Sequence, residues 1–238
     1  MERNGRMEPQ RAAFFDVDYT VLADNSASLF VRYLRRQGKV GLLTILNTLY
    51  YLARYKLNLL DFERLAERET MRYAGQPERE MIELCDRWFR ELVVEQIYPE
   101  AAALIRDHRE KGEPVALLSA ATVYLVRPLA EHLGVEHYLC NRLEVADGLF
   151  TGKLRRPICY GAGKLTLAEA FCQEHGLALS DSRYYSDSIT DLAVLERFGE
   201  PVAVNPDPLL RREARRRGWP ILEFQRPPGV LGRARSGK

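Results

Sequence analysis

The spacing of hydrophobic and polar positions changes along the chain in a way that predicts a parallel sheet with a helical insertion. Residues 11–17 form a short apolar and aromatic run that leads into acidic residues, which is typical of a buried strand. Over residues 26–96, apolar residues recur at three- and four-residue spacing, which predicts about four helices and no strand. After Tyr98, strand-like and helical segments alternate, as in βαβ units.

The alternating part of the chain contains several predicted elements. The expected strands are 114–119, 183–186, 202–204 and 221–224; the expected helices are 100–111, one ending at Gly134, 163–175, 190–198 and one before the last strand. Pro128 either kinks its helix or marks the first turn. Asp147-Gly148 separates two alternating runs within 142–154, which predicts a β-hairpin. These strands and the first one are expected to form one sheet.

Composition and charge exclude several classes of protein. The 238 residues are 46% hydrophobic and 29% charged, which is the composition of a globular protein and not of a disordered or collagenous one. The net charge of +2 gives no general reason to expect binding to nucleic acid. The uncharged run 40–53 is shorter than the roughly 20 residues of a membrane span, so we expect a buried or surface-docking helix there. The arginines of 211–217 are expected to form a solvated helix face.

Cysteine usage and the N-terminus favour a cytoplasmic protein. The four cysteines form no CxxC pair and no metal-ligand spacing with the four histidines, so neither a disulfide framework nor a structural zinc site is indicated. The polar residues 1–11 do not resemble a signal peptide. The Arg-, Gly- and Pro-rich segment 226–238 is expected to be disordered.

Four carboxylates follow two predicted strands. Asp16 and Asp18 point to the same side at the end of the first strand, because strand side chains alternate. An isolated Asp-x-Asp pair is most often a solvated turn, but this one ends an apolar strand, where α/β sheets bind ligands. Asp187 and Asp191 follow a second strand. A role as the N-cap of the next helix could account for one of these aspartates, but not for both. Such an oxygen-rich cluster suits Mg²⁺.

Two further features suit a phosphate group. Ser119 and Ala120 end a parallel strand, where a hydroxyl and free backbone N–H groups at a helix start can hold phosphoryl oxygens. Lys164, near a predicted helix start, is a candidate cation for a phosphoryl group. Considered by itself, a lysine at this position is more often simply exposed to solvent. Residues 161–164 do not have the spacing of a P-loop.

The ordered motifs FFDVDYTVL, LLSAAT, GAGK and YYSDSITDLAVL together resemble the haloacid dehalogenase (HAD) superfamily. The resemblance covers about residues 12–224 and is greatest to the phosphoserine phosphatase-like subfamily IB. It implies an α/β fold with a Rossmann-like three-layer parallel-sheet core and an inserted all-helical cap domain. The core would comprise residues 1–24 and 97–225, and the cap residues 25–96.

The resemblance also implies a role for each motif residue. Asp16 is then the nucleophile that becomes an aspartyl phosphate, and Asp18 is the general acid and base. Mg²⁺ is held by Asp16, the backbone carbonyl of Asp18 and Asp187, and Asp191 supports the site. Ser119, Ala120 and Lys164 bind the phosphoryl group, while Thr20 braces the first motif beside the substrate.

The substrate is the least determined part of the expectation. Where phosphoserine phosphatases carry a glutamate that holds the amino group of the substrate, this chain has Asn25, and Arg64 and Arg68 lie near the expected cap arginine. The substrate is expected to be a small phosphorylated metabolite: phosphoserine, histidinol phosphate or a lysophospholipid. The tyrosines of 50–55 suit cap packing better than a peripheral lipid contact. A phosphotransferase or phosphomutase remains an alternative, and a receiver-like signalling module is disfavoured.

Overall fold

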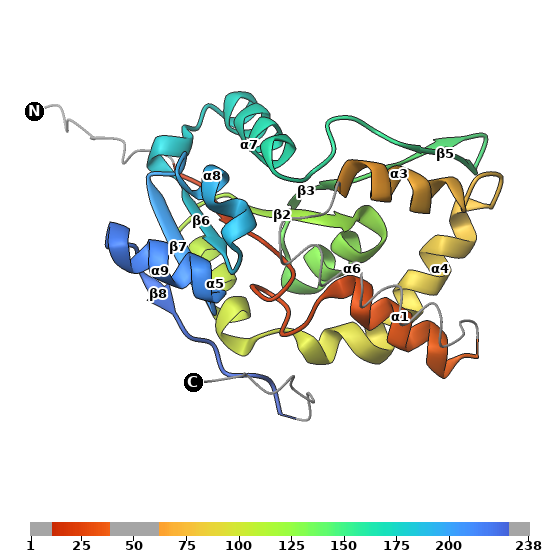
Figure 1. The fold of residues 1–238 in the computed structure, drawn as a ribbon, viewed down its shortest axis with the longest axis horizontal. Helices are drawn as coiled ribbons and strands as arrows, with labels where there is room; N and C mark the ends of the chain where they lie inside the picture. The colour runs from red at the N-terminus through yellow and green to blue at the C-terminus, as the bar shows by residue number, and fades with distance from the viewer. Residues whose placement is uncertain (1–10, 39–61, 229–238) are drawn as a thin grey trace, which may run out of the picture.

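The computed structural model describes residues 11–38 and 62–228 (Figure 1). Its core is a six-stranded sheet in the order β3-β2-β1-β6-β7-β8, in which every described pairing is parallel. The strands are β1 (Ala13–Phe15), β2 (Val115–Thr122), β3 (His137–Asn141), β6 (Arg183–Ser186), β7 (Glu200–Val204) and β8 (Ile221–Leu222). The predicted α/β parallel sheet is therefore confirmed.

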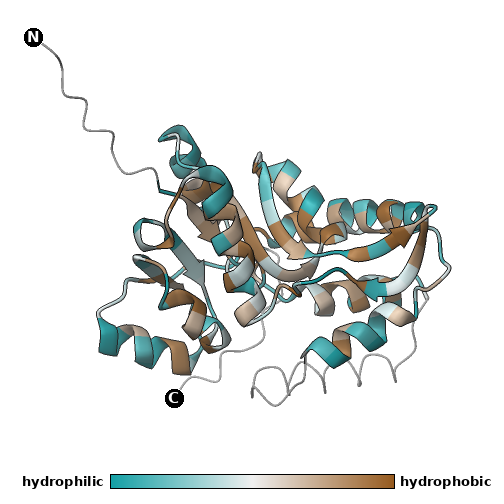
Figure 2. Ribbon diagram, turned by 90° about the horizontal axis from the view of Figure 1, so that it is seen from above, coloured by the Kyte–Doolittle hydropathy of each residue, from teal (hydrophilic) through white to brown (hydrophobic). Residues whose placement is uncertain are grey.

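Alternate residues of β1 enter two hydrophobic cores, one on each face of the sheet. Phe15 packs in the core formed with α5 (Pro99–Glu110) and α6 (Val123–Leu133). Phe14 packs in the other core, with α7 (Ala162–His175), α8 (Leu192–Leu195) and α9 (Pro208–Arg217). Figure 2 shows hydrophobic residues gathered in the strands between helices with hydrophilic outer faces. The result is the expected three-layer arrangement.

The regular elements described between β1 and β2 are all helical and are joined by loops and turns. This segment contains α1 (Ser26–Arg36), α3 (Phe62–Met71) and α4 (Glu78–Trp88), which continues into a π-helical turn and a 3-10 turn. Gly75 and Pro77 separate α3 from α4 as predicted, and Gly75 has a φ of 78° that favours glycine. The helix expected over 40–53 lies outside the described residues.

A β-hairpin follows β3 in the chain and lies against this helical segment. It consists of β4 (Leu143–Ala146) and β5 (Leu149–Leu154), joined at the predicted Asp147-Gly148 turn. Its Phe150 exchanges backbone hydrogen bonds with Gly75 and Gln76, at 2.8 and 3.0 Å. Arg156, just beyond β5, pairs with Glu63 and Glu67 of α3. The hairpin therefore joins the helical segment to the sheet domain.

Some predicted boundaries differ from the structure. Strand β3 was not predicted: it is an edge strand whose first three residues are only half-buried, so its pattern lacks a fully apolar run. The helix expected over 190–198 consists of a 3-10 turn and the single turn of α8. Pro128 lies inside α6. The N-terminal tail to residue 10 and residues 229–238 lie outside the described part. Within the described helices, none is long and apolar enough to cross a membrane.

Candidate active site

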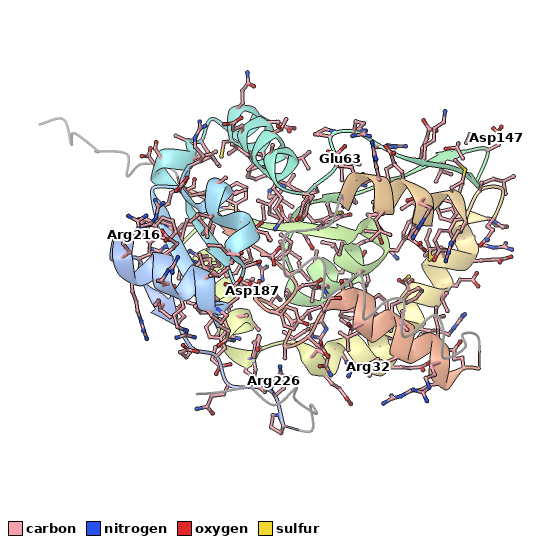
Figure 3. The ribbon with its side chains drawn as sticks, in the orientation of Figure 1. Arg32, Glu63, Asp147, Asp187, Arg216 and Arg226 are labelled. Carbon is pink, nitrogen blue, oxygen red and sulfur yellow. The ribbon has the colours of Figure 1, made fainter. Side chains whose placement is uncertain are left out.

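The candidate residues gather at the carboxyl edge of the sheet around β1. The strand order reverses there: β2 and β3 lie on one side of β1, and β6 to β8 on the other. Ligands of open α/β sheets bind at such a point. Asp16 and Asp18 follow β1, Ser119 lies in β2, and Asp187 follows β6. Figure 3 shows Asp187 near the middle of the molecule.

Lys164 joins two of the predicted aspartates. Its Nζ donates to Asp16 Oδ1 and to Asp191 Oδ2, each at 2.7 Å, and to the Tyr184 hydroxyl at 3.0 Å. Lys164 is only 3% exposed to solvent. A buried ammonium needs such carboxylate partners, because an unpaired buried charge is costly. The sequence suggested an exposed helix-start lysine as the simpler interpretation, and that interpretation is wrong.

Two partners of Asp191 were not singled out from the sequence. Tyr184 and Ser186 both donate from their hydroxyl groups to Asp191 Oδ2, at 2.6 and 2.8 Å. They alternate along β6 and so point to one face, a pattern that was available in the sequence RYYS. Together with Lys164, these donors hold Asp191 beside Asp16.

Gly163 allows the first turn of α7 to approach the preceding loop, and so places Lys164. A Cβ at Gly163 would lie 1.9 Å from the carbonyl oxygen of Ile158. We expect Gly163→Ala to lower the free energy of unfolding by about 2–3 kcal/mol, although Ala normally favours a helix. Urea unfolding measures this change, with the exposed Thr166→Ala on the same helix as the control. Equal stability of the two variants would contradict the close approach.

The side chain of Asp18 lies against the start of α1, where its carboxylate accepts three hydrogen bonds. The donors are Asn25 Nδ2, at 2.7 Å, and the backbone amide and hydroxyl of Ser26, each at 3.0 Å. The contribution of Ser26 was not predicted. The Asn25 carboxamide thus bonds Asp18, and its oxygen accepts from Ser28 N at 3.2 Å.

Asp187 is held by the loop before α9. Its carbonyl accepts from Asp207 N at 2.8 Å, while the Asp207 side chain accepts from Ile189 N at 2.8 Å and caps α9. Asp207 had not been singled out, because an Asp before Pro208 has the pattern of an ordinary N-cap. It ties the loop carrying Asp187 to a second helix.

Burial and like charges raise the pKa values of the aspartates. Burial raises the pKa of Asp16 to about 6, against the opposing effect of Lys164, and burial with the neighbouring Asp16 raises that of Asp18 to about 7. The pKa of Asp187 lies well above its usual value, because of burial and then the carboxylates of Asp16, Asp191, Asp207 and Asp18. The site therefore has more carboxylates than the single Lys164 can neutralise.

This excess of negative charge fits a divalent cation with oxygen ligands. Within residues 11–38 and 62–228, no three His, Cys, Asp or Glu side chains are close enough to form a metal cluster by themselves. The expected set of two aspartate side chains and one backbone carbonyl does not need such a cluster. The donor chemistry of the residues present thus agrees with Mg²⁺.

The predicted phosphate-binding residues lie at the end of β2. Ser119 is buried, and its hydroxyl accepts from Ala121 N at 3.1 Å. Ala120 is fixed through its carbonyl, which accepts from Asn141 Nδ2 at 2.7 Å; Asn141 also accepts from Cys159 N. Asn141 on the unpredicted β3 therefore connects the end of β2 to the loop that precedes α7.

Thr20 and the arginines of α3 have different surroundings. Thr20 is fully buried, and its hydroxyl has no hydrogen-bond partner among the described residues.

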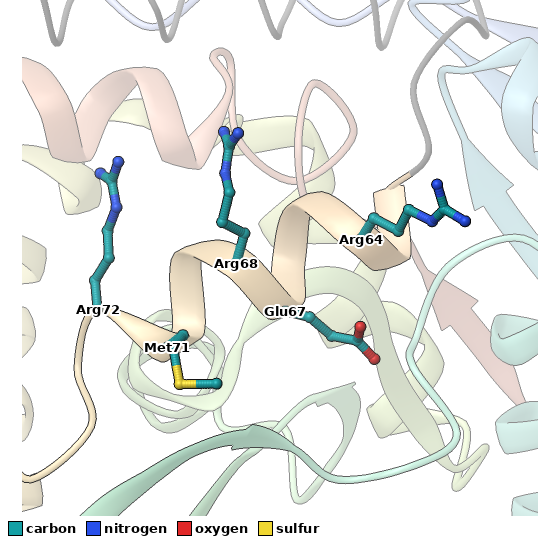
Figure 4. A pocket seen from close by; sticks show the side chains of 5 residues that line it. All are labelled: Arg64, Glu67, Arg68, Met71 and Arg72. Carbon is teal, nitrogen blue, oxygen red and sulfur yellow. The ribbon is translucent and has the colours of Figure 1, made fainter.

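Arg64 and Arg68 are exposed on α3, where they help to line a pocket of about 480 Å³ together with Glu67, Met71 and Arg72 (Figure 4). None of the candidate aspartates lines this pocket.

Comparison with known proteins identifies the family to which the chain belongs. The family model of haloacid dehalogenase-like hydrolases matches residues 13–196. The chain belongs to this family. A probable phosphatase of Mycobacterium tuberculosis is 35% identical over 93% of this chain and 78% of its own length. A phosphoserine phosphatase of the same organism is 32% identical over 94% and 74%, and a histidinol-phosphatase of Neisseria meningitidis is 28% identical over 90% and 98%.

Solved structures share the fold. A Bordetella pertussis protein of unknown function has a TM-score of 0.80 and 29% identity, covering 90% of this chain and 99% of its own. A phosphoserine phosphatase solved as a phospho-aspartyl intermediate analogue has a TM-score of 0.69 and 19% identity, covering 92% and 95%. The expectation of a phosphatase of the HAD family with a phosphoserine phosphatase-like fold is confirmed.

Proposed function

We propose that the protein is a Mg²⁺-dependent phosphomonoesterase that forms an aspartyl phosphate on Asp16. The observation that carries the proposal is the Lys164 ammonium, buried between Asp16 and Asp191 at the switch point of the sheet. An anionic nucleophile can approach an anionic phosphate only where positive charge offsets the repulsion. Lys164 supplies one such charge beside the nucleophile.

The cation would be held by the side chains of Asp16 and Asp187 and by the backbone carbonyl of Asp18. When bound, it supplies positive charge that screens the phosphoryl oxygens from the carboxylates. Asp191 would keep Lys164 in place through the contact described above.

The protein's own residues divide the hydrolysis into two steps. An oxygen of Asp16 forms a bond to phosphorus, the ester P–O bond breaks, and Asp18 gives its proton to the departing oxygen. Asp18 then takes a proton from water as the water oxygen attacks phosphorus and releases Asp16. The raised pKa of Asp18, about 7, lets this carboxyl be protonated before the first step and ionised before the second.

We assign the phosphoryl group to Ser119, Ala120 and Lys164, with Thr20 bracing the loop. Arg64 and Arg68 lie on the proposed cap, residues 25–96, and would contact the remainder of the substrate. The core would then be 1–24 and 97–225, and the enzyme would act in the cytoplasm. The relatives named above favour phosphoserine and histidinol phosphate among small phosphorylated metabolites. Phosphate release from lysophosphatidate in the test below would indicate a lysophospholipid substrate, and p-nitrophenol formed in excess of phosphate would indicate transfer to an organic acceptor.

Phosphate release from p-nitrophenyl phosphate, phosphoserine, histidinol phosphate and lysophosphatidate tests the proposal. With EDTA we expect less than about 1% of the activity, and full recovery with Mg²⁺, because the carboxylates otherwise repel the phosphate. Asp187→Asn should raise the Mg²⁺ concentration for half-maximal activity by at least about tenfold. Asp181→Asn, which alters an exposed aspartate near β6, is the control. Activity that persists in EDTA would contradict the metal assignment.

A further inference from the structure

The carboxylate of Asp18 is held by the first turn of α1. Asn25 donates to Oδ2, while Ser26 donates to Oδ1 from its amide and to Oδ2 from its hydroxyl. Asn25 and Ser26 are only 8% and 7% exposed, so these bonds are largely shielded from water. The orientation of the Asp18 carboxyl therefore depends on where α1 begins.

The second end of the Asn25 carboxamide fixes its orientation. Its Oδ1 accepts from Ser28 N and so caps α1. A flipped amide would place this oxygen against the Asp18 carboxylate and lose both bonds. Asn25 also donates from its backbone to Asp24, which pairs with Arg32 on the outer side of α1. Both polar ends of the Asn25 side chain are thus used within the protein.

We propose that Asn25 is a positioning residue that holds Asp18 for proton transfer to the leaving group. This inference rests on the proposed function, in which Asp18 is the general acid. The sequence suggested that Asn25 contacts the substrate. The inference instead gives Asn25 the role of holding Asp18. Because α1 is the first helix of the proposed cap, the same contact makes the geometry of the acid depend on the placement of the cap.

The chemistry of the leaving group distinguishes positioning from a general structural role. In the first step the ester P–O bond breaks, and its electron pair remains on the departing oxygen, which receives the proton of Asp18. An alkoxide needs this proton, whereas p-nitrophenolate departs readily as an anion. Proton transfer requires hydrogen-bond reach, so displacement of Asp18 should slow the alkyl ester selectively.

Asn25→Ser tests the inference, because serine can still cap α1 but is too short to reach Asp18. The measurement is kcat/KM, which includes the steps through departure of the leaving group, for p-nitrophenyl phosphate and for the best alkyl phosphomonoester of the panel. We expect a loss of at least about tenfold with the alkyl ester and less than about threefold with the aryl ester. Equal losses, or no loss with the alkyl ester, would overturn the inference.

Two controls separate positioning from misfolding. Arg32→Ala removes the pair with Asp24 but leaves the Asn25–Asp18 bond, so both kcat/KM values should remain within about twofold of wild type. In an Asp18→Asn background, Asn25→Ser should have little further effect, because the group that it positions has been altered. Fully additive losses would contradict the inference. A wild-type protein that hydrolyses neither ester would contradict the proposed function and this inference with it.

Discussion

Asp16→Asn should lower kcat for phosphate release by at least about 10³-fold, because an amide cannot replace the carboxylate nucleophile. The substitution keeps the size of a side chain that is 7% exposed in the centre of the site. A coupled assay of inorganic phosphate with the best substrate of the panel measures the effect.

The matched control for Asp16→Asn is Asp207→Asn. Asp207 carries the same group and lies in the loop that holds Asp187, but it contacts backbone amides. Its loss should cost about 1 kcal/mol of stability, as for a lost helix cap, and less than about tenfold in kcat. An Asp16→Asn variant with more than a tenth of wild-type activity would contradict the nucleophile assignment.

Lys164→Met should impair both activity and folding. The variant leaves the buried Asp16 and Asp191 carboxylates without their shared cation, so we expect the free energy of unfolding at neutral pH to fall by about 3–5 kcal/mol. We also expect kcat to fall by at least about 10²-fold, since the charge beside the nucleophile is lost. Urea unfolding and phosphate release under conditions where the variant is folded measure the two effects.

Lys111→Met provides the comparison for Lys164→Met. Lys111 also pairs with an aspartate, Asp107, but their side chains are 56% and 49% exposed, near the end of α5. Exposed pairs contribute little, so this variant should change stability by less than about 1 kcal/mol and leave kcat unchanged. Similar effects of the two lysine substitutions would show that burial of the Lys164 pair carries no special weight.

The sequence was most informative where the pattern is local. The apolar strand β1, strand β6 at Arg183–Ser186 and the Asp147-Gly148 turn each depend on side-chain alternation or turn chemistry within a few residues. The convergence of Asp16, Asp187 and Ser119 could also be predicted, because parallel strands end at the same edge of a sheet.

Other features depend on contacts between distant segments and left no local pattern. The burial of Lys164 requires Asp16, 148 positions away. Asn141 joins Ala120 to Cys159 from an edge strand whose sequence does not alternate clearly. The hairpin meets the helical segment through the backbone of Phe150, and backbone pairing carries little sequence signature. The positions of these residues follow from tertiary packing.

The central claim is that phosphate passes through Asp16, and trapping of the phosphoenzyme tests it most directly. A ³²P-labelled phosphomonoester is mixed with excess enzyme and Mg²⁺, quenched in acid within the first turnover, and the labelled peptide is identified. The account predicts that the peptide containing Asp16 carries the label, and that hydroxylamine releases the label from it, as expected of an acyl phosphate. It predicts no label in Asp16→Asn. Turnover without labelled protein, or label that persists in Asp16→Asn, would contradict it.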